Sequence, residues 1–288
     1  MVNEDNAAAP NAEQIAYWNG PGGERWLAHQ ERQDEVLAPV FDALFARVGA
    51  LDGEHVIDVG CGCGTTTIEL GRRVGSGGRA LGVDVSAPMV ARARARVPPG
   101  LQVEFAQADA TVHRFDPKRA GLLFSRFGVM FFDDPVASFA NLHRGLQSGG
   151  RVLFACWREA RANPWVMLPL AAVTRHVPRL PELGPEDPGP FSFASETRVR
   201  RVLADAGYGQ IALEPVDLLL DIATGGGIEG ALETTTRVGP ASRALSDQPA
   251  ALQTAALDEL RAALAPHLDG GRIPLAGAIW IVSARAGR

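Results

Sequence analysis

A glycine-rich turn between two regular segments is the first place where this sequence could bind a ligand. His55–Val59 is a short, mostly β-branched run that predicts a buried strand, and Thr65–Val74 has the pattern of a helix. The turn between them, with the start of the helix, contains Gly60, Gly62, Gly64, Thr65 and Thr66. Glycines allow a tight turn and let backbone N–H groups approach a ligand, while a helix N-terminus favours a negative group. Because purely structural turns share this pattern, it needs support from other loops.

Two carboxylates follow the next two predicted strands. Asp84 lies 24 residues beyond Gly60, where it can accept hydrogen bonds from ribose hydroxyls. Asp109 follows the strand Leu101–Gln107, where it can accept a hydrogen bond from an exocyclic amine. Each carboxylate could instead cap a turn or a helix. Since open α/β sheets bind ligands at the carboxyl ends of their strands, we expect the three loops to share one crevice.

Short apolar strands that alternate with helices must position these loops, and this alternation indicates an α/β fold. We expect a Rossmann-like, seven-stranded, mostly parallel sheet with an antiparallel last strand, helices on both faces and helical lid insertions. The predicted strands are 55–59, 79–83, 101–107, 122–127, 151–157, 211–220 and 276–284.

The same patterns divide the chain into a core and additions to it. Residues 1–48 are predicted to form a helical cap over the ligand site, with two helices joined at Gly20–Gly23. The core is expected to comprise 49–160, a helix and strand in 195–224, and the final strand in 271–288. The proline-rich segment 161–194 and the helical segment 225–270 read as insertions.

Charge and composition exclude several classes of protein. The net charge is −5 and no strongly basic stretch occurs, which disfavours a nucleic-acid partner. The acidic N-terminus is unlike a secretory signal, and no apolar run is long enough to span a membrane, so we expect a cytoplasmic protein. The three cysteines lack the ligand pattern of a zinc site, and no metal is expected.

These motifs together resemble the class I S-adenosylmethionine-dependent methyltransferases. The resemblance rests on Asp58-Val-Gly-Cys-Gly-Cys-Gly64, on Gly82-Val-Asp-Val-Ser86 with Met89, and on Asp109. Further segments resemble a bacterial subgroup of the methyltransferase-11 and ubiquinone/menaquinone-type group. They are Tyr17-Trp-Asn-Gly-Pro-Gly-Gly-Glu-Arg-Trp26, Ser125-Arg-Phe-Gly-Val-Met-Phe-Phe-Asp-Asp-Pro135, Gly149-Gly150 and Trp157.

The resemblance implies a cofactor, S-adenosylmethionine, and a role for each motif. Gly60, Cys61 and Gly62 would contact its methionine part, within a site that also includes Asp58, Gly64, Thr65 and Thr66. Asp84 would bind the ribose, Val85 and Met89 would flank the adenine, and Asp109 and Ala110 would contact its amine. Ser125 would face the cofactor near the reacting sulfonium, with Arg126 beside it.

The acceptor side is less well defined by the sequence. We expect a small organic acceptor with an apolar part, methylated on O, N or C, and a monomer or homodimer. The best candidate for a general base is His29, with His176 as another residue that could face the acceptor. The candidates for the pocket wall are Trp18, Trp26, Met130, Trp157 and Trp165.

Two other functions remain open at this point. A regulatory or scaffold protein could bind the cofactor without catalysis, which would agree with the lack of an evident base. A nicotinamide-dependent oxidoreductase could use a similar sheet. The dinucleotide fingerprint G-x-G-x-x-G is not met, however, because residue 65 is Thr.

Overall fold

In the computed structural model, which describes residues 10–287, seven strands form one sheet of order β3-β2-β1-β4-β5-β7-β6. The strands are β1 (His55–Val59), β2 (Arg79–Asp84), β3 (Val103–Gln107), β4 (Ala120–Arg126), β5 (Leu146–Trp157), β6 (Tyr208–Asp221) and β7 (Pro274–Ala286). Strands β1 to β5 pair in parallel, whereas β7 is antiparallel to both β5 and β6. The predicted α/β class, with a mostly parallel sheet and an antiparallel last strand, is confirmed.

Helices cover both faces of this sheet. The core helices are α5 (Thr65–Val74), α6 (Ala87–Ala95), α7 (Pro135–Gly145) and α9 (Glu196–Asp205), and the short 3-10 turns are Gly128–Phe131, Ala160–Ala162 and Ala265–His267. Phe124 of β4 lies opposite Leu153, so Phe124 and Phe154 point to opposite faces. Phe45 packs on Phe124, and Phe139 of α7 packs on Phe154, so one aromatic contact anchors a helix to each face.

The N-terminal region differs from the prediction of two helices joined at Gly20–Gly23. It forms four short helices: α1 (Ala12–Asn19), α2 (Pro21–Ala28), α3 (Gln30–Val36) and α4 (Ala38–Phe45). Pro21 begins α2, and Gly23 lies inside this helix. Only glycine fits at position 23, because a Cβ there would be 1.9 Å from the carbonyl oxygen of Trp18. The glycines therefore allow two helices to cross closely rather than forming an open turn. Residues 1–9 of the predicted cap, and Arg288 of the predicted final segment, lie outside the described residues.

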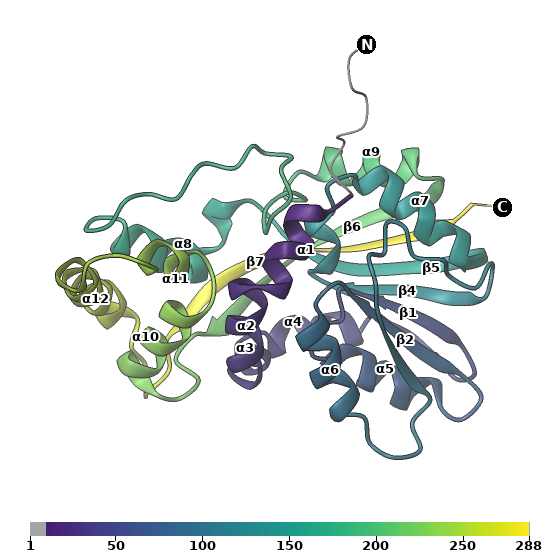
Figure 1. Cartoon of the computed structure of the whole chain (residues 1–288), viewed down its shortest axis with the longest axis horizontal. Helices are drawn as coiled ribbons and strands as arrows, with labels where there is room; N and C mark the ends of the chain where they lie inside the picture. Colours follow the sequence, from purple (N-terminus) through teal and green to yellow (C-terminus); the bar gives the residue numbers. More distant parts are fainter. Residues whose placement is uncertain (1–9, 288) are drawn as a thin grey trace, which may run out of the picture.

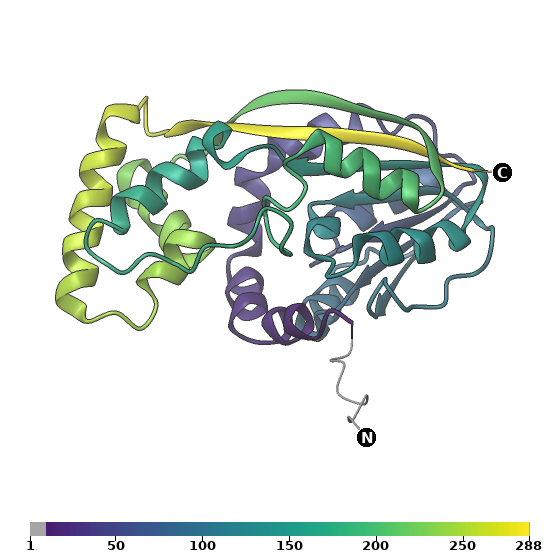
Figure 2. The same cartoon turned by 90° about the horizontal axis from the view of Figure 1, so that it is seen from above.

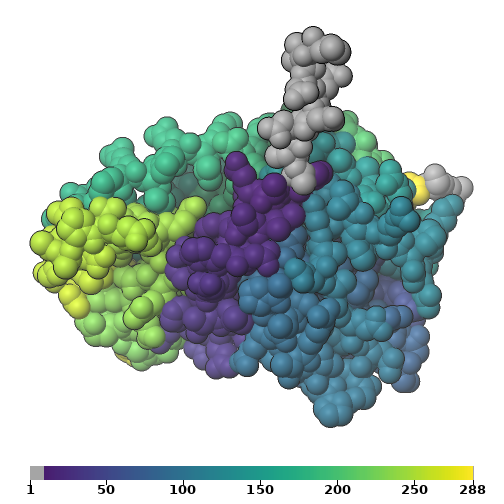
Figure 3. Space-filling view, viewed as in Figure 1, coloured from purple at the N-terminus to yellow at the C-terminus, as the bar shows by residue number. Residues whose placement is uncertain are grey.

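Four further helices form a separate group that we call the helical lobe. They are α8 (Pro164–Val173), α10 (Gly227–Arg237), α11 (Pro240–Leu245) and α12 (Ala250–Leu264). Helix α8 packs on α11 and α12, so the two segments predicted as insertions meet in one body. In Figures 1 and 2, helices α1–α4 lie between this lobe and the sheet, and long strands β6 and β7 connect the lobe to the core. Figure 3 shows the purple N-terminal region between the yellow-green lobe and the blue core.

The described residues contain no helix that combines the length and the apolar character needed to cross a membrane.

Asp58 ties the first strand of the core to the helix that follows it. Its carboxylate is fully buried at the end of β1, where Oδ2 accepts hydrogen bonds from the hydroxyls of Thr66 (2.7 Å) and Thr67 (2.6 Å). Burial raises the pKa of Asp58 to about 6, although the two hydroxyls act in the opposite direction. A carboxyl with a raised pKa in the folded chain stabilises the fold below its ordinary value of 3.8, and this contribution is lost as the pH rises through about 6.

Replacement of Asp58 by Asn removes this titration and should change how stability depends on pH. From pH 4.5 to pH 7.5, the free energy of unfolding of the original chain should fall by about 2 kcal/mol relative to that of Asp58→Asn. Urea unfolding of both proteins at the two pH values measures this difference. Parallel pH profiles for the two proteins would show that burial does not raise the pKa of Asp58.

Candidate active site

A cavity of about 560 Å³ lies where the carboxyl ends of the strands meet the N-terminal helices and the helical lobe. The core contributes the turn after β1, the loops after β2, β3 and β4, and Trp157 at the end of β5. The other side is formed by α1, α2, α3, α8, α10 and α11, together with the segment 183–191. Residues that are far apart in the chain therefore share one cavity, at the end of the sheet where open α/β folds bind ligands.

The glycine turn is shaped by a close approach to the turn after β4. Gly60 has a φ of 66°, and a Cβ at this position would lie 2.4 Å from Gly128 Cα, so only glycine fits. The backbone N–H groups of Gly60 and Cys61 both donate to the carbonyl of Val83, which joins the turn to β2. The chain of Gly60, Cys61, Gly62 and Cys63 then borders the cavity. Burial raises the pKa of both thiols in the turn.

Asp84 stands beside this turn at the end of β2 and borders the cavity. Its Oδ2 accepts a hydrogen bond from the backbone N–H of Gly62 (2.8 Å), and Oδ1 accepts one from that of Ser86 (2.9 Å). Burial raises the pKa of Asp84, while these N–H donors act to lower it. A carboxylate oxygen accepts more than one hydrogen bond, so Asp84 keeps capacity for hydroxyl donors of a ligand.

Asp109 occupies the next loop, also on the cavity. Its Oδ1 accepts hydrogen bonds from Asn11 Nδ2 (2.8 Å) and from the backbone N–H of Thr111 (2.9 Å). Its Oδ2 accepts none from any residue in 10–287 and is available to an amine. Asn11, which the sequence reading did not single out, is 3% exposed and also accepts from the backbone N–H of Asp133 (2.8 Å). It thereby joins the cap to two core loops.

The remaining predicted cofactor residues fall into two groups. Those that border the cavity are Thr65, Thr66, Val85, Met89, Ala110 and Arg126. Asp58, Gly64 and Ser125 do not border it. The expectation that Ser125 faces the cofactor is not met, since its buried hydroxyl donates to the Val59 carbonyl (2.7 Å) and accepts from the Gly128 N–H (3.1 Å). Ser125 instead holds the turns after β1 and β4 together.

An ion pair between Arg126 and Asp34 joins the core to α3 on the wall of the cavity. Arg126 Nη2 lies 2.7 Å from Asp34 Oδ1, and the two side chains are only 13% and 19% exposed. Asp34 also accepts hydrogen bonds from Thr65 Oγ1 (2.6 Å) and from the amide of Gln30. Burial alone would raise the pKa of Asp34, but Arg126 and these hydrogen bonds outweigh it and hold the pKa below its ordinary value.

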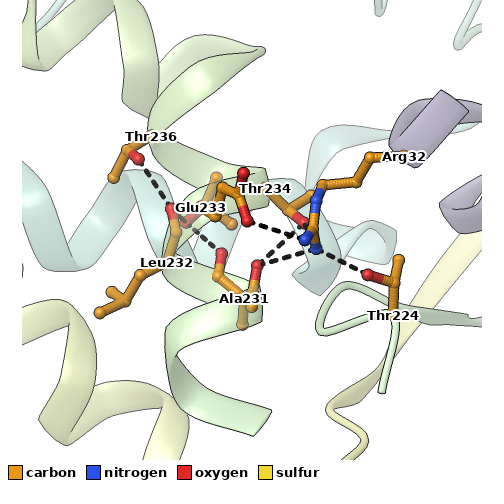
Figure 4. A network of polar contacts seen from close by, with 9 residues as sticks. Arg32, Thr224, Ala231, Leu232, Glu233, Thr234 and Thr236 are labelled. Atoms are coloured by element: carbon orange, nitrogen blue, oxygen red, sulfur yellow. Dashed lines mark hydrogen bonds and ion pairs between the residues drawn. The ribbon is translucent and has the colours of Figure 1, made fainter. Parts of the chain in front are cut away.

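The opposite side of α3 is fastened to the helical lobe by Arg32. Figure 4 shows its guanidinium among polar groups of α10 and the preceding loop. Arg32 donates to Thr224 Oγ1 (2.6 Å) and to Glu233 (2.8 Å), with longer contacts to Thr234 Oγ1 and the Gly230 carbonyl (3.3 Å each). The polar contacts of Arg32 and Asp34 hold α3 between the core and the lobe. The sequence analysis did not single out either of these two residues.

Aromatic side chains form much of the remaining wall. Trp157 stacks on Phe127, with ring centroids 4.2 Å apart, and meets Trp165 of α8 at 4.9 Å. Trp18 lies edge-on to Phe131 (5.3 Å) and to Trp26 (6.3 Å). The five predicted wall residues, Trp18, Trp26, Met130, Trp157 and Trp165, all border the cavity.

Neither His29, the candidate base, nor His176, the residue expected to face the acceptor, borders this cavity. His29 lies on a second, open cavity between α2, α10, α11 and α12, where burial and then Arg237 lower its pKa. His176 lies 3.7 Å from Glu259 of α12. Within residues 10–287, no three His, Cys, Asp or Glu side chains are grouped to hold a metal.

Comparison with known proteins agrees with this geometry. A family model described as a methyltransferase domain matches residues 56–150, which carry the glycine turn, Asp84 and Asp109. The trans-aconitate 2-methyltransferase of Afipia carboxidovorans is 30% identical over 199 residues, which cover 68% of this chain and 71% of that protein. The aklanonic acid methyltransferase DauC of a Streptomyces species is 30% identical over 122 residues, or 42% of this chain and 56% of that protein.

A solved structure shows the same fold. The phosphoethanolamine N-methyltransferase 2 of Haemonchus contortus, in complex with S-adenosyl-L-methionine, superposes with a TM-score of 0.58 at 16% identity. The match covers 95% of this chain and 60% of that one. With the matching relatives and the cofactor loops described above, it follows that this chain belongs to the class I S-adenosylmethionine-dependent methyltransferases.

Proposed function

We propose that this enzyme transfers a methyl group from S-adenosylmethionine to a small organic acceptor bound in the central cavity. The observation that carries the proposal is that the three predicted cofactor loops and the aromatic wall border one cavity. A donor held at the loops and an acceptor held at the wall would therefore meet without leaving the protein. The named relatives act on trans-aconitate and aklanonic acid, which supports an organic acceptor of modest size.

The residues on the core side fit the cofactor. Asp84 would accept hydrogen bonds from the ribose hydroxyls, and the unpartnered Oδ2 of Asp109 would accept one from the adenine amine, with Ala110 beside it. Val85 and Met89 would pack on the adenine, and Gly60–Gly62 would contact the methionine part. Bound there, S-adenosylmethionine supplies a methyl group activated on a sulfonium.

The protein's own contribution is to position the acceptor and to exclude water. Alignment of the reacting groups can lower a barrier by roughly 7–11 kcal/mol in well-oriented cases. Histidine is absent from the residues of 10–287 that border the cavity, and Asp34 is held by Arg126. We therefore propose that catalysis relies on alignment, and that a proton leaving the acceptor passes to solvent rather than to a histidine.

We further propose that segments 161–194 and 225–270 act as an acceptor lid. Trp165, Val166 and Pro169 of α8 and Ala241 of α11 border the cavity opposite the cofactor loops. Loops and insertions placed on a rigid sheet commonly determine specificity. Exchange of residues 164–192 for those of a relative should change acceptor preference and leave cofactor affinity unchanged.

Calorimetric titration tests the cofactor site. S-adenosylhomocysteine should bind the protein, and NADH should not. Asp84→Asn should weaken S-adenosylhomocysteine binding by about 10- to 100-fold, because hydrogen bonds to a charged group contribute roughly 1.5–3 kcal/mol. Asp116→Asn, at an exposed loop away from the cavity, is the matched control. Unchanged affinity in Asp84→Asn would remove Asp84 from the cofactor site.

Transfer of a labelled methyl group across an acceptor panel tests the reaction itself. We expect turnover of at least one small organic acceptor, with one S-adenosylhomocysteine formed for each methyl group transferred. Firm binding of S-adenosylhomocysteine without turnover of any acceptor would instead favour a regulatory cofactor-binding protein.

The position of His29 outside the central cavity leads to a further expectation. His29→Gln should leave kcat/KM for a turned-over acceptor within about twofold of the original enzyme, as for substitutions away from the reacting groups. Steady-state kinetics at pH 6 and pH 8 measure this. A hundredfold fall in kcat with little change in KM would restore His29 as a base.

A further inference from the structure

Helix α3 presents an unusual set of residues to the cavity. Gln30, Gln33, Asp34 and Leu37, at spacings of three and four, all border it. The inward face of such a helix is ordinarily apolar, but here three of the four positions are polar. Buried polar groups are nearly always hydrogen-bonded, so each of these side chains requires a partner.

Two of these side chains have amide atoms without a hydrogen-bond partner among residues 10–287: Gln33 and, at its Oε1, Gln30. Asp34 is held by Arg126 and Thr65, and the Gln30 amide donates to Asp34. Gln33 is 4% exposed, yet its side chain makes no hydrogen bond to any of residues 10–287. Gln30 Oε1 is fully enclosed, whereas the amide of Gln33 keeps contact with open space. Because Gln33 borders the cavity, a molecule bound there would be within reach of its amide.

The neighbouring wall is aromatic. Trp157 is 6% exposed, and its ring lies between Phe127 and Trp165. Its indole N–H also has no hydrogen-bond partner within residues 10–287, and it is not among the fully enclosed polar atoms. A flat ring in the cavity would therefore pack against this group of aromatic side chains rather than stack on a free face of Trp157, and it would meet an N–H donor there.

The charges on the cavity wall are of two kinds. Asp34 follows Gln33 directly, and its carboxylate is neutralised by Arg126. Arg25 of α2 and Arg243 of α11 also border the cavity, and neither forms an ion pair with any of residues 10–287. The amide of Gln33 itself carries no charge and suits a neutral hydroxyl or carbonyl.

Resting on the proposed methyl transfer, we propose that Gln33 is a specificity-determining residue of the acceptor site. Its amide binds a neutral hydroxyl or carbonyl group on an aromatic acceptor, whose ring packs against Trp157 and Phe127. The acceptor is thus an oxygen-bearing aromatic molecule.

Two probes that differ in a single group test this proposal. 2-Naphthol and 2-methylnaphthalene have the same ring and substituents of similar size, but only naphthol forms hydrogen bonds. Their affinities for the enzyme saturated with S-adenosylhomocysteine are measured by ligand-observed NMR titration. Gln33→Met should weaken naphthol binding about tenfold and change methylnaphthalene binding by less than twofold. Gln102→Met, at an exposed position, should alter neither.

Each other result overturns the proposal. These results are an equal loss for both probes in Gln33→Met, no binding of either probe, or tighter binding of trans-aconitate than of naphthol. Prior titration with S-adenosylhomocysteine establishes that each variant is folded, and Gln33→Leu replaces Gln33→Met if that variant does not bind it. Failure of the original enzyme to bind S-adenosylhomocysteine would instead count against the proposed methyl transfer.

Discussion

The ion pair between Asp34 and Arg126 is the interaction on which the shape of the site depends. It fixes α3 to the end of β4 and, through Thr65, to the start of α5, while the adjacent Arg32 fixes the same helix to the lobe. Removal of one partner of a buried ion pair typically costs about 3–5 kcal/mol, because the other charge remains buried without compensation. The pair thus holds α3 against the core at the wall of the cavity, while Arg32 holds the same helix against the lobe.

The core of the molecule could be predicted from the sequence because its signals are local. The run ending at Val59, the alternate glycines and the spacing to Asp84 each lie within a short stretch, and they correctly indicated the parallel sheet and the loops at its carboxyl ends. The cap could not be predicted in this way. Arg126 and Asp34 are 92 residues apart, and the polar spacing of Gln30, Gln33 and Asp34 was the one sign that α3 faces a polar partner. Gly20 does separate two helices, as expected, but Gly22 and Gly23 lie within α2 against α1, a contact that is identified only in three dimensions.

The misplacement of His29 and Ser125 has a common physical origin. Both were assigned from where their segment was expected to lie, although a helix or a strand end directs neighbouring side chains to different sides. His29 caps the end of α2 and turns toward the lobe, while the hydroxyl of Ser125 is used up by the backbone of two turns. A fold shared by enzymes with different acceptors fixes where chemistry occurs, but the side chains that reach that place decide what the chemistry is.

The long antiparallel strands β6 and β7 are joined by a segment whose residues can change without a change in the sheet. The segment between them, residues 222–273, starts and ends side by side, because Asp221 pairs with Pro274 and the Ile222 N–H donates to the Ile273 carbonyl. The two ends of this segment therefore lie next to each other. Residues can be gained, lost or exchanged within the segment without shifting the register of the sheet or moving the loops at the carboxyl ends of β1 to β3. Related enzymes could thus acquire new acceptors through mutations in one continuous stretch of about fifty codons, while the loops proposed to bind the methyl donor keep their sequence.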